Sequence, residues 1–265
     1  MRIYDQNIWG NMKPEHKIAN RNLLIRELIL AYQPDVCGFQ ECNPKTSRAG
    51  DTPIAELLSP VYEEVFATGA GYNFTPLFYK KESMTLCDEG WLLFDGKNDK
   101  SSKSVTWAIL EEKATQKRAA FLSIHFWWKW ESDEDTLLRR ENARQLVALC
   151  NELAEKYPVP FFVMGDLNSG DGAHQGDDAY RTMRALGMRD LRELAKESTD
   201  MRTAHEYPML NESGEYVGGG QPYKTLDYIF GYGNAPTAVE SFRVLTEQNA
   251  LDSSDHCPLV ADIQL

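Results

Sequence analysis

Apolar and polar residues alternate along this chain in blocks, and most of the apolar blocks have the length of one β-strand. Short runs rich in Val, Ile, Phe, Tyr and Trp that lie between turn residues are typical of strands. We expect strands at residues 2–8, 35–40, 61–67, 74–80, 84–86, 105–111, 119–126, 161–164, 224–230, 238–245 and 258–264.

Other segments have the apolar spacing of helices. The clearest pattern covers residues 134–156, where Leu146, Cys150 and Leu153 fall on one helical face. We expect helices at residues 16–32, 51–58, 134–156, 178–186 and 191–197. Strands outnumber helices, and helices lie between some of them, which favours a β-sandwich covered by helices. No internal repeat and no linker interrupts the chain, so residues 1–265 are expected to form a single domain.

Polar side chains stand where many of the expected strands end. A rigid scaffold can hold reactive groups at such positions. The set contains carboxylates, amides and two histidines but no cysteine cluster, and this suits a hard divalent cation and phosphate ester chemistry. Its members are Asn7, Gln40, Glu41, His125, Gly165, Asp166, Leu167, Asn168, Asp227, Ser254, Asp255 and His256.

The tetrapeptide Gly165–Asn168 is the strongest single motif in this set. Gly165 allows a sharp turn out of the strand, and the spacing lets Asp166 and Asn168 reach one point. The carboxylate could then orient a water molecule while the amide donates to a phosphoryl oxygen. The same residues could instead form an Asx turn that only caps the strand.

Each remaining motif also has a purely structural interpretation. Glu41 follows a buried strand and there needs a partner or a metal, but it could be a solvated loop acid. Asn7 could be a strand-end amide, and His125 could be a histidine satisfied within the core.

Asp255 could ligate a cation while His256 handles a proton and Asp227 fixes the tautomer of the imidazole. A surface acid beside a packed histidine would give the same tripeptide. Among the other histidines, His16 and His174 are expected at the surface. His205 lies in a loop expected near the site and stays a candidate for substrate binding.

Taken in order, these motifs resemble the endonuclease/exonuclease/phosphatase superfamily, which has the DNase I-like fold. The order and the rough spacing match from residue 3 to residue 263, and six motifs in register are far more specific than any one of them. The resemblance implies a four-layered α/β sandwich, with two packed, mostly antiparallel sheets flanked by helices. It also implies Mg²⁺-dependent cleavage of a phosphate ester, with Mn²⁺ or Ca²⁺ as alternative ions.

The same resemblance implies Glu41 as the main Mg²⁺ ligand, with Asn7 and Asp255 close to the ion. Some nucleases of the superfamily have an acidic residue two positions after the first-strand Asn, where this chain has Trp9. That departure shifts the metal binding onto Glu41. Tyr79 lies where many members have a tyrosine or another polar group near the phosphate, and it is a further candidate for substrate binding.

The remaining roles concern the phosphate. Asp166 resembles the residue that positions or deprotonates the attacking water, and Asn168 resembles the amide that holds the scissile phosphate. His256, oriented by Asp227, resembles the acid/base or the stabiliser of the transition state. His125 resembles the second histidine that faces the phosphate.

Charge and cysteine content narrow the class of protein. The formal net charge is -12 at pH 7, which repels a polyanion and counts against high-affinity non-specific binding of nucleic acid. The five cysteines include no CxxC pair, so we interpret them as reduced thiols rather than disulfides and expect a cytoplasmic monomer. No apolar run approaches the ~20 residues that would span a bilayer.

Two segments bear on the substrate. Trp127 and Trp128 follow His125 closely and could stack on a base, a sugar or an apolar leaving group, or could form a hydrophobic plug. The Gly-rich residues 213–222 could move over the site or be an exposed connector. Five lysines come nearest to a basic stripe, and we interpret them as a solvated face. They are Lys80, Lys81, Lys97, Lys100 and Lys103.

Together these features favour hydrolysis of a small or carbohydrate-linked phosphate ester. A metal-dependent endonuclease or exonuclease is the alternative, and a binding protein that keeps the fold without turnover is the third hypothesis.

Overall fold

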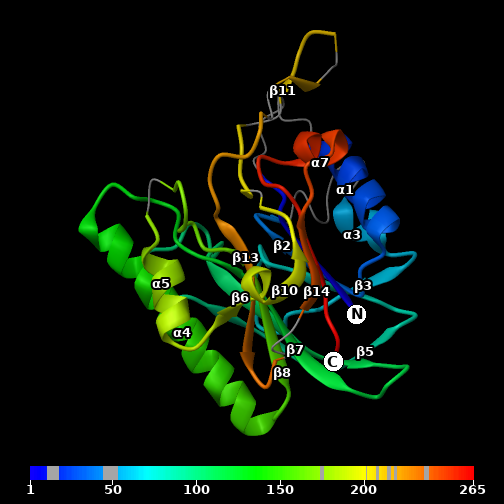
Figure 1. The fold of residues 1–265 in the computed structure, drawn as a ribbon, viewed down its shortest axis with the longest axis vertical. Coiled ribbons are helices and arrows are strands. Elements are labelled where there is room, and N and C mark those ends of the chain that lie inside the picture. Colours follow the sequence, from blue (N-terminus) through cyan, green and yellow to red (C-terminus); the bar gives the residue numbers. More distant parts are fainter. Residues whose placement is uncertain are drawn as a thin grey trace.

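Two β-sheets pack face to face, and helices cover both outer sides (Figure 1). The computed structural model describes residues 1–10, 18–43, 53–173, 176–200, 202–206, 209–213, 216–217, 220–235 and 239–265. The four-layered α/β sandwich expected from the sequence is therefore confirmed. Most strand pairs are antiparallel, and the parallel ones are β1 with β2, β7 with β8, and β10 with β14.

The first sheet has seven strands in the order β10-β14-β15-β1-β2-β4-β3. Their bounds are β1 (Arg2–Asn7), β2 (Val36–Gln40), β3 (Tyr62–Glu64), β4 (Leu77–Lys80), β10 (Ala195–Ser198), β14 (Val239–Val244) and β15 (Leu259–Asp262). The second sheet has six strands in the order β5-β6-β7-β8-β13-β9. These are β5 (Met84–Leu93), β6 (Ser104–Glu112), β7 (Arg118–His125), β8 (Pro160–Asp166), β9 (Arg189–Asp190) and β13 (Asp227–Gly233).

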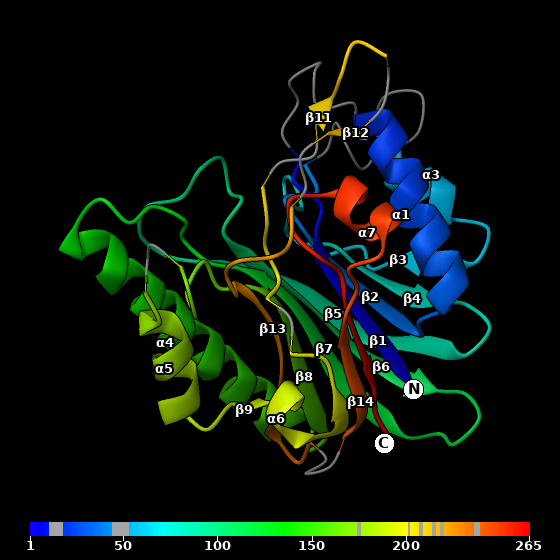
Figure 2. The same ribbon diagram turned by 45° about the horizontal axis from the view of Figure 1, so that its top comes forward.

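The helices divide between the two outer faces, as Figures 1 and 2 show. Beside the first sheet lie α1 (Ile18–Tyr32), α3 (Ile54–Leu58) and α7 (Gln248–Ser253). Beside the second lie α4 (Asp133–Lys156) and α5 (Asp178–Ala185), and the short α6 (Leu191–Leu194) leads into β10. A two-stranded hairpin of β11 (Met209–Leu210) and β12 (Tyr216–Val217) projects from the upper end of both views.

Three apolar clusters separate the four layers. The inner cluster takes residues from both sheets, including Ile3, Val36, Phe121 and Phe162. The second cluster packs α4 and α5 on the second sheet, and the third packs α1, α3 and α7 on the first. Helix α4 starts with a capping box between Ser132 and Asp135, which satisfies backbone donors of its first turn.

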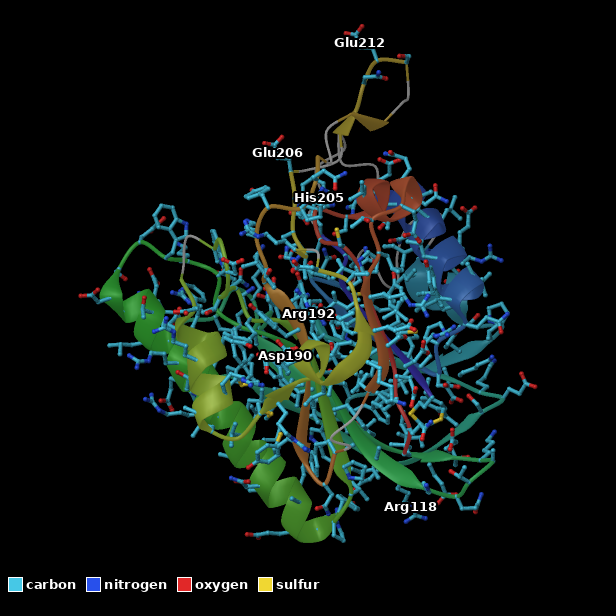
Figure 3. All side chains as sticks on the ribbon, viewed as in Figure 1. Arg118, Asp190, Arg192, His205, Glu206 and Glu212 are labelled. Atoms are coloured by element: carbon cyan, nitrogen blue, oxygen red, sulfur yellow. The ribbon has the colours of Figure 1, made fainter. Side chains whose placement is uncertain are left out.

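Strand register brings the polar motifs together at one end of the sandwich. In the parallel pair of β1 and β2, Asn7 is opposite Gln40. In the second sheet, Asp166 is opposite both His125 on β7 and Asp227 on β13. The two sheets approach closely here, since a Cβ on Gly38 would come within 2.7 Å of the sulfur of Met164. Arg118 and the chain termini mark the opposite end (Figures 1 and 3).

Several sequence predictions of elements were wrong in extent. The helix expected at residues 191–197 ends at Leu194, because Ala195–Ser198 pairs with β14 as an edge strand. The strand expected at residues 84–86 continues to Leu93, with a register shift between Leu86 and Asp88. Strand β5 lies at the edge of its sheet and is half buried, so it contains polar residues. These residues interrupt the apolar pattern from which its length was predicted. Helix α7 was not predicted.

Among the described residues, no helix combines the length and the apolar character needed to cross a bilayer. The expected positions of His16 and His174 lie outside the described residues.

Candidate active site

A cavity of about 530 Å³ opens at the end of the sandwich where the polar motifs meet. Its size falls within the range of pockets that bind small molecules. Most of the residues predicted from the sequence line it, although they come from segments far apart in the chain. Those that line it are Glu41, His125, Trp128, Asp166, Asn168, Asp255 and His256.

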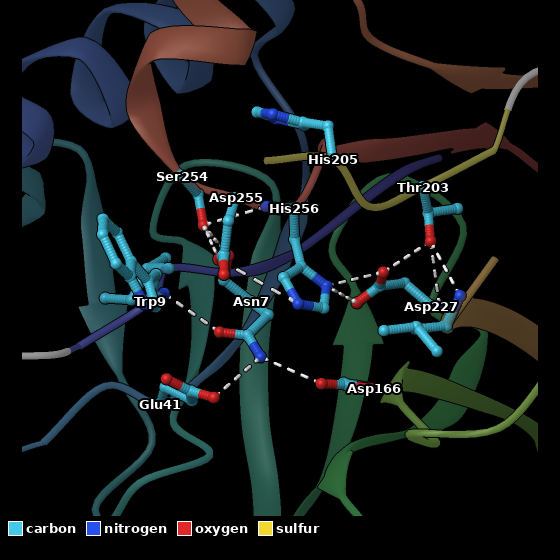
Figure 4. A network of polar contacts seen from close by, with 12 residues as sticks. Asn7, Trp9, Glu41, Asp166, Thr203, His205, Asp227, Ser254, Asp255 and His256 are labelled. Carbon is cyan, nitrogen blue, oxygen red and sulfur yellow. Dashed lines mark hydrogen bonds and ion pairs between the residues drawn. The ribbon is translucent and has the colours of Figure 1, made fainter. Parts of the chain in front are cut away.

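Asn7 connects the carboxylates of the two sheets (Figure 4). Its Nδ2 donates to Glu41 Oε1 at 3.3 Å and to Asp166 Oδ2 at 3.0 Å, and its Oδ1 accepts from the backbone of Trp9 at 3.0 Å. Glu41 has a φ of 56°, a left-handed conformation that turns the chain sharply after β2. Asn7 thus presents its amide nitrogen to Glu41, and in this arrangement it positions the carboxylate.

Gln40 lies beneath the cavity and does not line it. Its Nε2 donates to Asp5 Oδ1 at 2.8 Å and to Ser123 Oγ at 3.1 Å. Ser123 belongs to β7, so these buried bonds join the two sheets directly below Glu41. They fix the relative position of the strands that carry the site.

Asp166 is surrounded by hydrogen-bond donors. Its Oδ1 accepts from the backbone of Asn168 at 2.7 Å, and its Oδ2 accepts from Asn7 and, at 3.3 Å, from Asn168 Nδ2. Burial alone would raise the pKa of Asp166, but the hydrogen bond from His125 and the charge of His256 hold it below its usual range. The carboxylate of Asp166 therefore stays ionised although it is buried.

The turn after β8 forms an Asx turn and also presents its polar side chains to the cavity, so the two interpretations of its sequence are compatible. The bond from the Asn168 backbone to Asp166 is an Asx-type turn, and both side chains still face the cavity. Gly165 has a φ of 144°, and a Cβ there would lie 2.1 Å from the carbonyl oxygen of Ile124. Only glycine fits this position, so the turn and the placement of Asp166 depend on it.

His256 and Asp227 form a buried pair. The Nδ1 of His256 lies 2.8 Å and 3.0 Å from the carboxylate oxygens of Asp227. Thr203 donates to Asp227 Oδ2 at 2.6 Å and accepts from the Asp227 backbone, which orients the carboxylate. Burial by itself would lower the pKa of His256, but the charges of Asp227 and Asp255 outweigh it and raise that pKa well above its usual value. No sequence motif indicates this role for Thr203.

Asp255 and Glu41 form an anionic pair that suits a cation. Burial raises the pKa of Asp255 to about 6, the charge of His256 opposes that rise, and the charge of Glu41 adds to it. Asp255 Oδ1 accepts a long hydrogen bond from Ser254 Oγ at 3.4 Å and lies 4.0 Å from His256 Nε2. Two carboxylates that line one cavity, each with a single long side-chain hydrogen bond among the described residues, suit a hard divalent ion.

A second group in the same region could also approach an ion. Single ligand atoms of Asp166, Asp227 and His256 lie within 4.8 Å of one another. However, His256 Nδ1 is already bonded to Asp227, and Asp227 also accepts from Thr203. We therefore interpret this group as a hydrogen-bonded relay, which leaves Glu41 and Asp255 as the better candidates for holding a cation.

His125 is buried at the end of β7 and contacts both Asn168 and a lysine. Its Nε2 lies 3.1 Å from Asn168 Nδ2 and 3.5 Å from Asp166 Oδ2. Lys103 Nζ lies 3.0 Å and 3.2 Å from the two ring nitrogens. Burial and the charge of Lys103 together lower the pKa of His125. The imidazole therefore faces the cavity as a neutral group.

Three predicted substrate-binding residues do not line this cavity. Tyr79 is buried in the inner core, opposite Val36 at the far end of β2. Trp127 is buried with its Nε1 donating to Asp135 Oδ1 at 2.7 Å, so it anchors the loop to α4. His205 lines a smaller adjoining pocket that includes Asp255 and His256. Figures 3 and 4 show His205 at the same end of the molecule as the site.

Trp128 and Trp130 form an aromatic wall of the cavity. They are 45% and 55% exposed, which leaves ring surface open to a ligand. Of the three tryptophans after His125, Trp127 alone is buried, so the interpretation as a hydrophobic plug fits Trp127 and does not fit Trp128.

The sequence and the fold of the chain are similar to those of known proteins. A family model described as "Endonuclease/Exonuclease/phosphatase family" matches residues 6–256. No curated protein matches the chain.

Solved structures of similar fold cover the whole chain. The mannosyl-6-phosphatase of Bacteroides thetaiotaomicron has a TM-score of 0.76 at 17% identity, with 100% of both chains covered. An endonuclease/exonuclease/phosphatase from Bacteroides vulgatus has a TM-score of 0.73 at 22% identity, covering 100% of this chain and 98% of its own. The human Nocturnin catalytic domain with bound sulfate has a TM-score of 0.66 at 21% identity, covering 100% and 94%. With the family model spanning nearly all of the sequence, this chain belongs to the endonuclease/exonuclease/phosphatase family.

Proposed function

We propose that the protein is a divalent-metal-dependent hydrolase that cleaves a small or carbohydrate-linked phosphate ester. The observation that carries this proposal is the meeting of Glu41, Asp166 and His256 in one cavity, although they come from three distant segments. Members of the family are phosphoric ester hydrolases. A charged, hydrogen-bonded and mostly buried site of this kind is costly to maintain without a ligand.

The ion would be held by Glu41 and Asp255, with Asn7 fixing the orientation of Glu41. We propose Mg²⁺, with Mn²⁺ or Ca²⁺ as alternatives, because the donors are carboxylate oxygens. When bound, the ion supplies positive charge to the phosphoryl group and to the leaving oxygen.

The protein side chains supply the remaining steps. Asp166 accepts a hydrogen bond from the attacking water and orients it towards phosphorus. Asn168 lines the cavity, and its Nδ2, which contacts His125 and the carbonyl oxygen of Phe126, would donate to a phosphoryl oxygen. His256, held by Asp227 at Nδ1, offers Nε2–H to the charge that develops in the transition state.

The shape and charge of the cavity support a small substrate. A volume of about 530 Å³ accommodates a phosphorylated sugar or a similar molecule, and Trp128 and Trp130 offer faces on which a sugar ring can stack. The net charge of -12 opposes a long polyanion. The likeness in fold to a mannosyl-6-phosphatase supports a carbohydrate-linked phosphate as the first substrate to test.

The experiment compares the hydrolysis of mono- and bis-nitrophenyl phosphate with plasmid nicking, all with added Mg²⁺. We expect nitrophenol release from at least one ester and no nicking. Nicking without nitrophenol release would instead support the nuclease. Absence of all three activities, together with no heat of Mg²⁺ binding, would contradict the proposal and support a non-catalytic protein.

A further inference from the structure

We propose that Lys103 is a phosphate-binding residue of this site and that it directs the site towards phosphate monoesters. The proposal deepens the function proposed above, on which its substrate preference rests. The observation behind it is a buried ammonium group that borders the cavity and has no carboxylate within ion-pair distance among the residues that the structure describes.

The backbone of Lys103 is fixed immediately before β6. Its carbonyl oxygen accepts from Asn98 Nδ2 at 2.8 Å and from the backbone of Phe94 at 3.1 Å. Its amide donates to Asn98 Oδ1 at 3.0 Å. These three bonds close the hairpin between β5 and β6, so the side chain leaves a constrained turn and enters the cavity wall.

Lys103 is buried, and within the described residues the close contacts of its ammonium group are to the neutral ring of His125. Lys103 is 4% exposed, and the contacts of its Nζ at 3.0 Å and 3.2 Å are both to His125. Within the described part of the chain, Lys103 forms no ion pair. Burial lowers the pKa of its ammonium group, and the charges of Glu41, Asp166 and Asp99 oppose that shift from farther away. Burying a charge without a close counter-ion is strongly unfavourable, so this position favours an anion supplied from the cavity.

The neighbouring lysines show how unusual this placement is. Lys97 is exposed, and its Nζ pairs with Glu134 Oε2 at 2.5 Å. Lys100 is also exposed. The interpretation of this run as a solvated face therefore holds for Lys97 and is wrong for the buried Lys103, while Lys100 is exposed but borders the same cavity.

The location of Lys103 identifies the anion as a phosphoryl group. His125 and Asn168 face the same part of the cavity, and the contacts at 3.0 Å and 3.1 Å place their polar atoms around one point beside Asp166. Asp166 is where we place the attacking water. A phosphoryl group within reach of that water also lies within reach of Lys103.

The extra charge favours one class of ester. A terminal monoester phosphate carries a charge of about -1.5 to -2 at pH 7 and offers three free oxygens. A diester carries one negative charge, and a second substituent occupies one of those oxygens. A fixed ammonium in addition to Asn168 and His125 therefore stabilises a bound monoester more than a bound diester.

The test compares Lys103→Met, Lys103→Arg and the matched surface control Lys97→Met. Binding of inorganic phosphate is measured by calorimetry with Mg²⁺ present, and kcat and KM are measured for mono- and bis-nitrophenyl phosphate. We expect Lys103→Met to weaken phosphate binding about tenfold or more and to reduce the ratio of monoester to diester kcat/KM by a similar factor. Lys103→Arg should retain most of the phosphate binding and most of the preference for the monoester. Lys97→Met should match wild type in both measurements.

Unchanged phosphate binding and an unchanged ester ratio in Lys103→Met would overturn the inference. So would wild-type protein that binds no phosphate. If wild type binds phosphate but hydrolyses neither ester, the proposed function fails, while the binding data still decide the role of Lys103. Should the methionine variant not fold, as judged by circular dichroism, Lys103→Gln replaces it with the same expected losses.

Discussion

His256 and Asp227 lie 29 positions apart in the chain, and their side chains meet at 2.8 Å between Nδ1 and Oδ2. The bond fixes Nδ1 of the imidazole towards the carboxylate and leaves Nε2 on the cavity side, 4.0 Å from Asp255 Oδ1. Thr203 in turn holds Asp227 through a bond of 2.6 Å. The imidazole is therefore oriented before any substrate binds, which is the arrangement required of a group that acts in the transition state.

Removing the charge of Asp227 should impair turnover without unfolding the protein. In Asp227→Asn the amide cannot stabilise the imidazolium or enforce the tautomer, so we expect kcat to fall by on the order of 10²-fold or more, with a smaller change in KM. Asp190→Asn is a matched control, since Asp190 is also a buried carboxylate but contacts Tyr180 and the backbone of Arg192 instead of His256. Equal kcat for wild type and Asp227→Asn would show that the pair has no catalytic role.

The tryptophans after His125 should separate into two classes. Trp128→Ala and Trp130→Ala should raise KM for a sugar phosphate several-fold with little change in stability, because both rings are exposed on the cavity wall. Trp127→Ala should instead lower the free energy of unfolding by about 3–5 kcal/mol, since it leaves a buried hole and removes the hydrogen bond to Asp135 Oδ1. Steady-state kinetics and urea denaturation distinguish these effects. A loss of stability in Trp128→Ala and Trp130→Ala, with a change of KM alone in Trp127→Ala, would contradict the proposed roles.

Asp262 should make stability depend on pH. Its carboxylate accepts from Arg2 Nε at 2.7 Å and from Ser241 Oγ at 2.8 Å. Burial alone would raise its pKa, but these bonds hold the pKa below the usual value. The stabilisation is then present above the unfolded pKa of about 3.9 and is lost as pH falls through the lower folded pKa.

We accordingly expect Asp262→Asn to cost about 1–2 kcal/mol in the free energy of unfolding at pH 7. The difference from wild type should shrink steadily below about pH 4. Urea denaturation at several pH values measures it. A difference that stays constant down to pH 2 would rule out the ionised carboxylate as its cause.

The cysteines should react very unequally. Cys87 is exposed, whereas Cys37, Cys42, Cys150 and Cys257 are buried thiols. Burial raises the pKa of Cys150 to about 12, which keeps it protonated and unreactive. A thiol reagent at pH 8 should modify Cys87 rapidly in the native protein and all five cysteines after denaturation. Fewer than five reactive thiols in the denatured, unreduced protein would reveal a disulfide and count against the proposed cytoplasmic location.

The sequence predicted those parts of the molecule that depend on local pattern. The apolar runs identified most strands, and the face containing Leu146 and Leu153 identified α4. The motifs at strand ends identified the lining of the cavity, because a residue that directly follows a buried strand has little freedom in where it points. Asp166 and Asn168 are the clearest case, since the turn that Gly165 allows directs both of them.

The remaining features depend on contacts that no local pattern encodes. Lys103 stands among exposed lysines and is buried only because β6 packs beside β7, which carries His125. Thr203 contacts Asp227 across 24 positions of chain. Tyr79 was misassigned because a tyrosine on an expected strand gives no sign of which end of the sheet it occupies. Ala195–Ser198 has helical residue types but gains hydrogen bonds by pairing with β14.

The most direct test measures release of nitrophenol from the better nitrophenyl phosphate by wild type and Asp166→Asn, each with Mg²⁺ and with EDTA. Circular dichroism verifies that both proteins are folded. We predict wild-type activity with Mg²⁺, none in EDTA with recovery when Mg²⁺ is restored, and a loss of on the order of 10²-fold or more in Asp166→Asn. Full activity of wild type in EDTA, or of Asp166→Asn with Mg²⁺, would contradict the assignment of this cavity as a metal-dependent hydrolytic site.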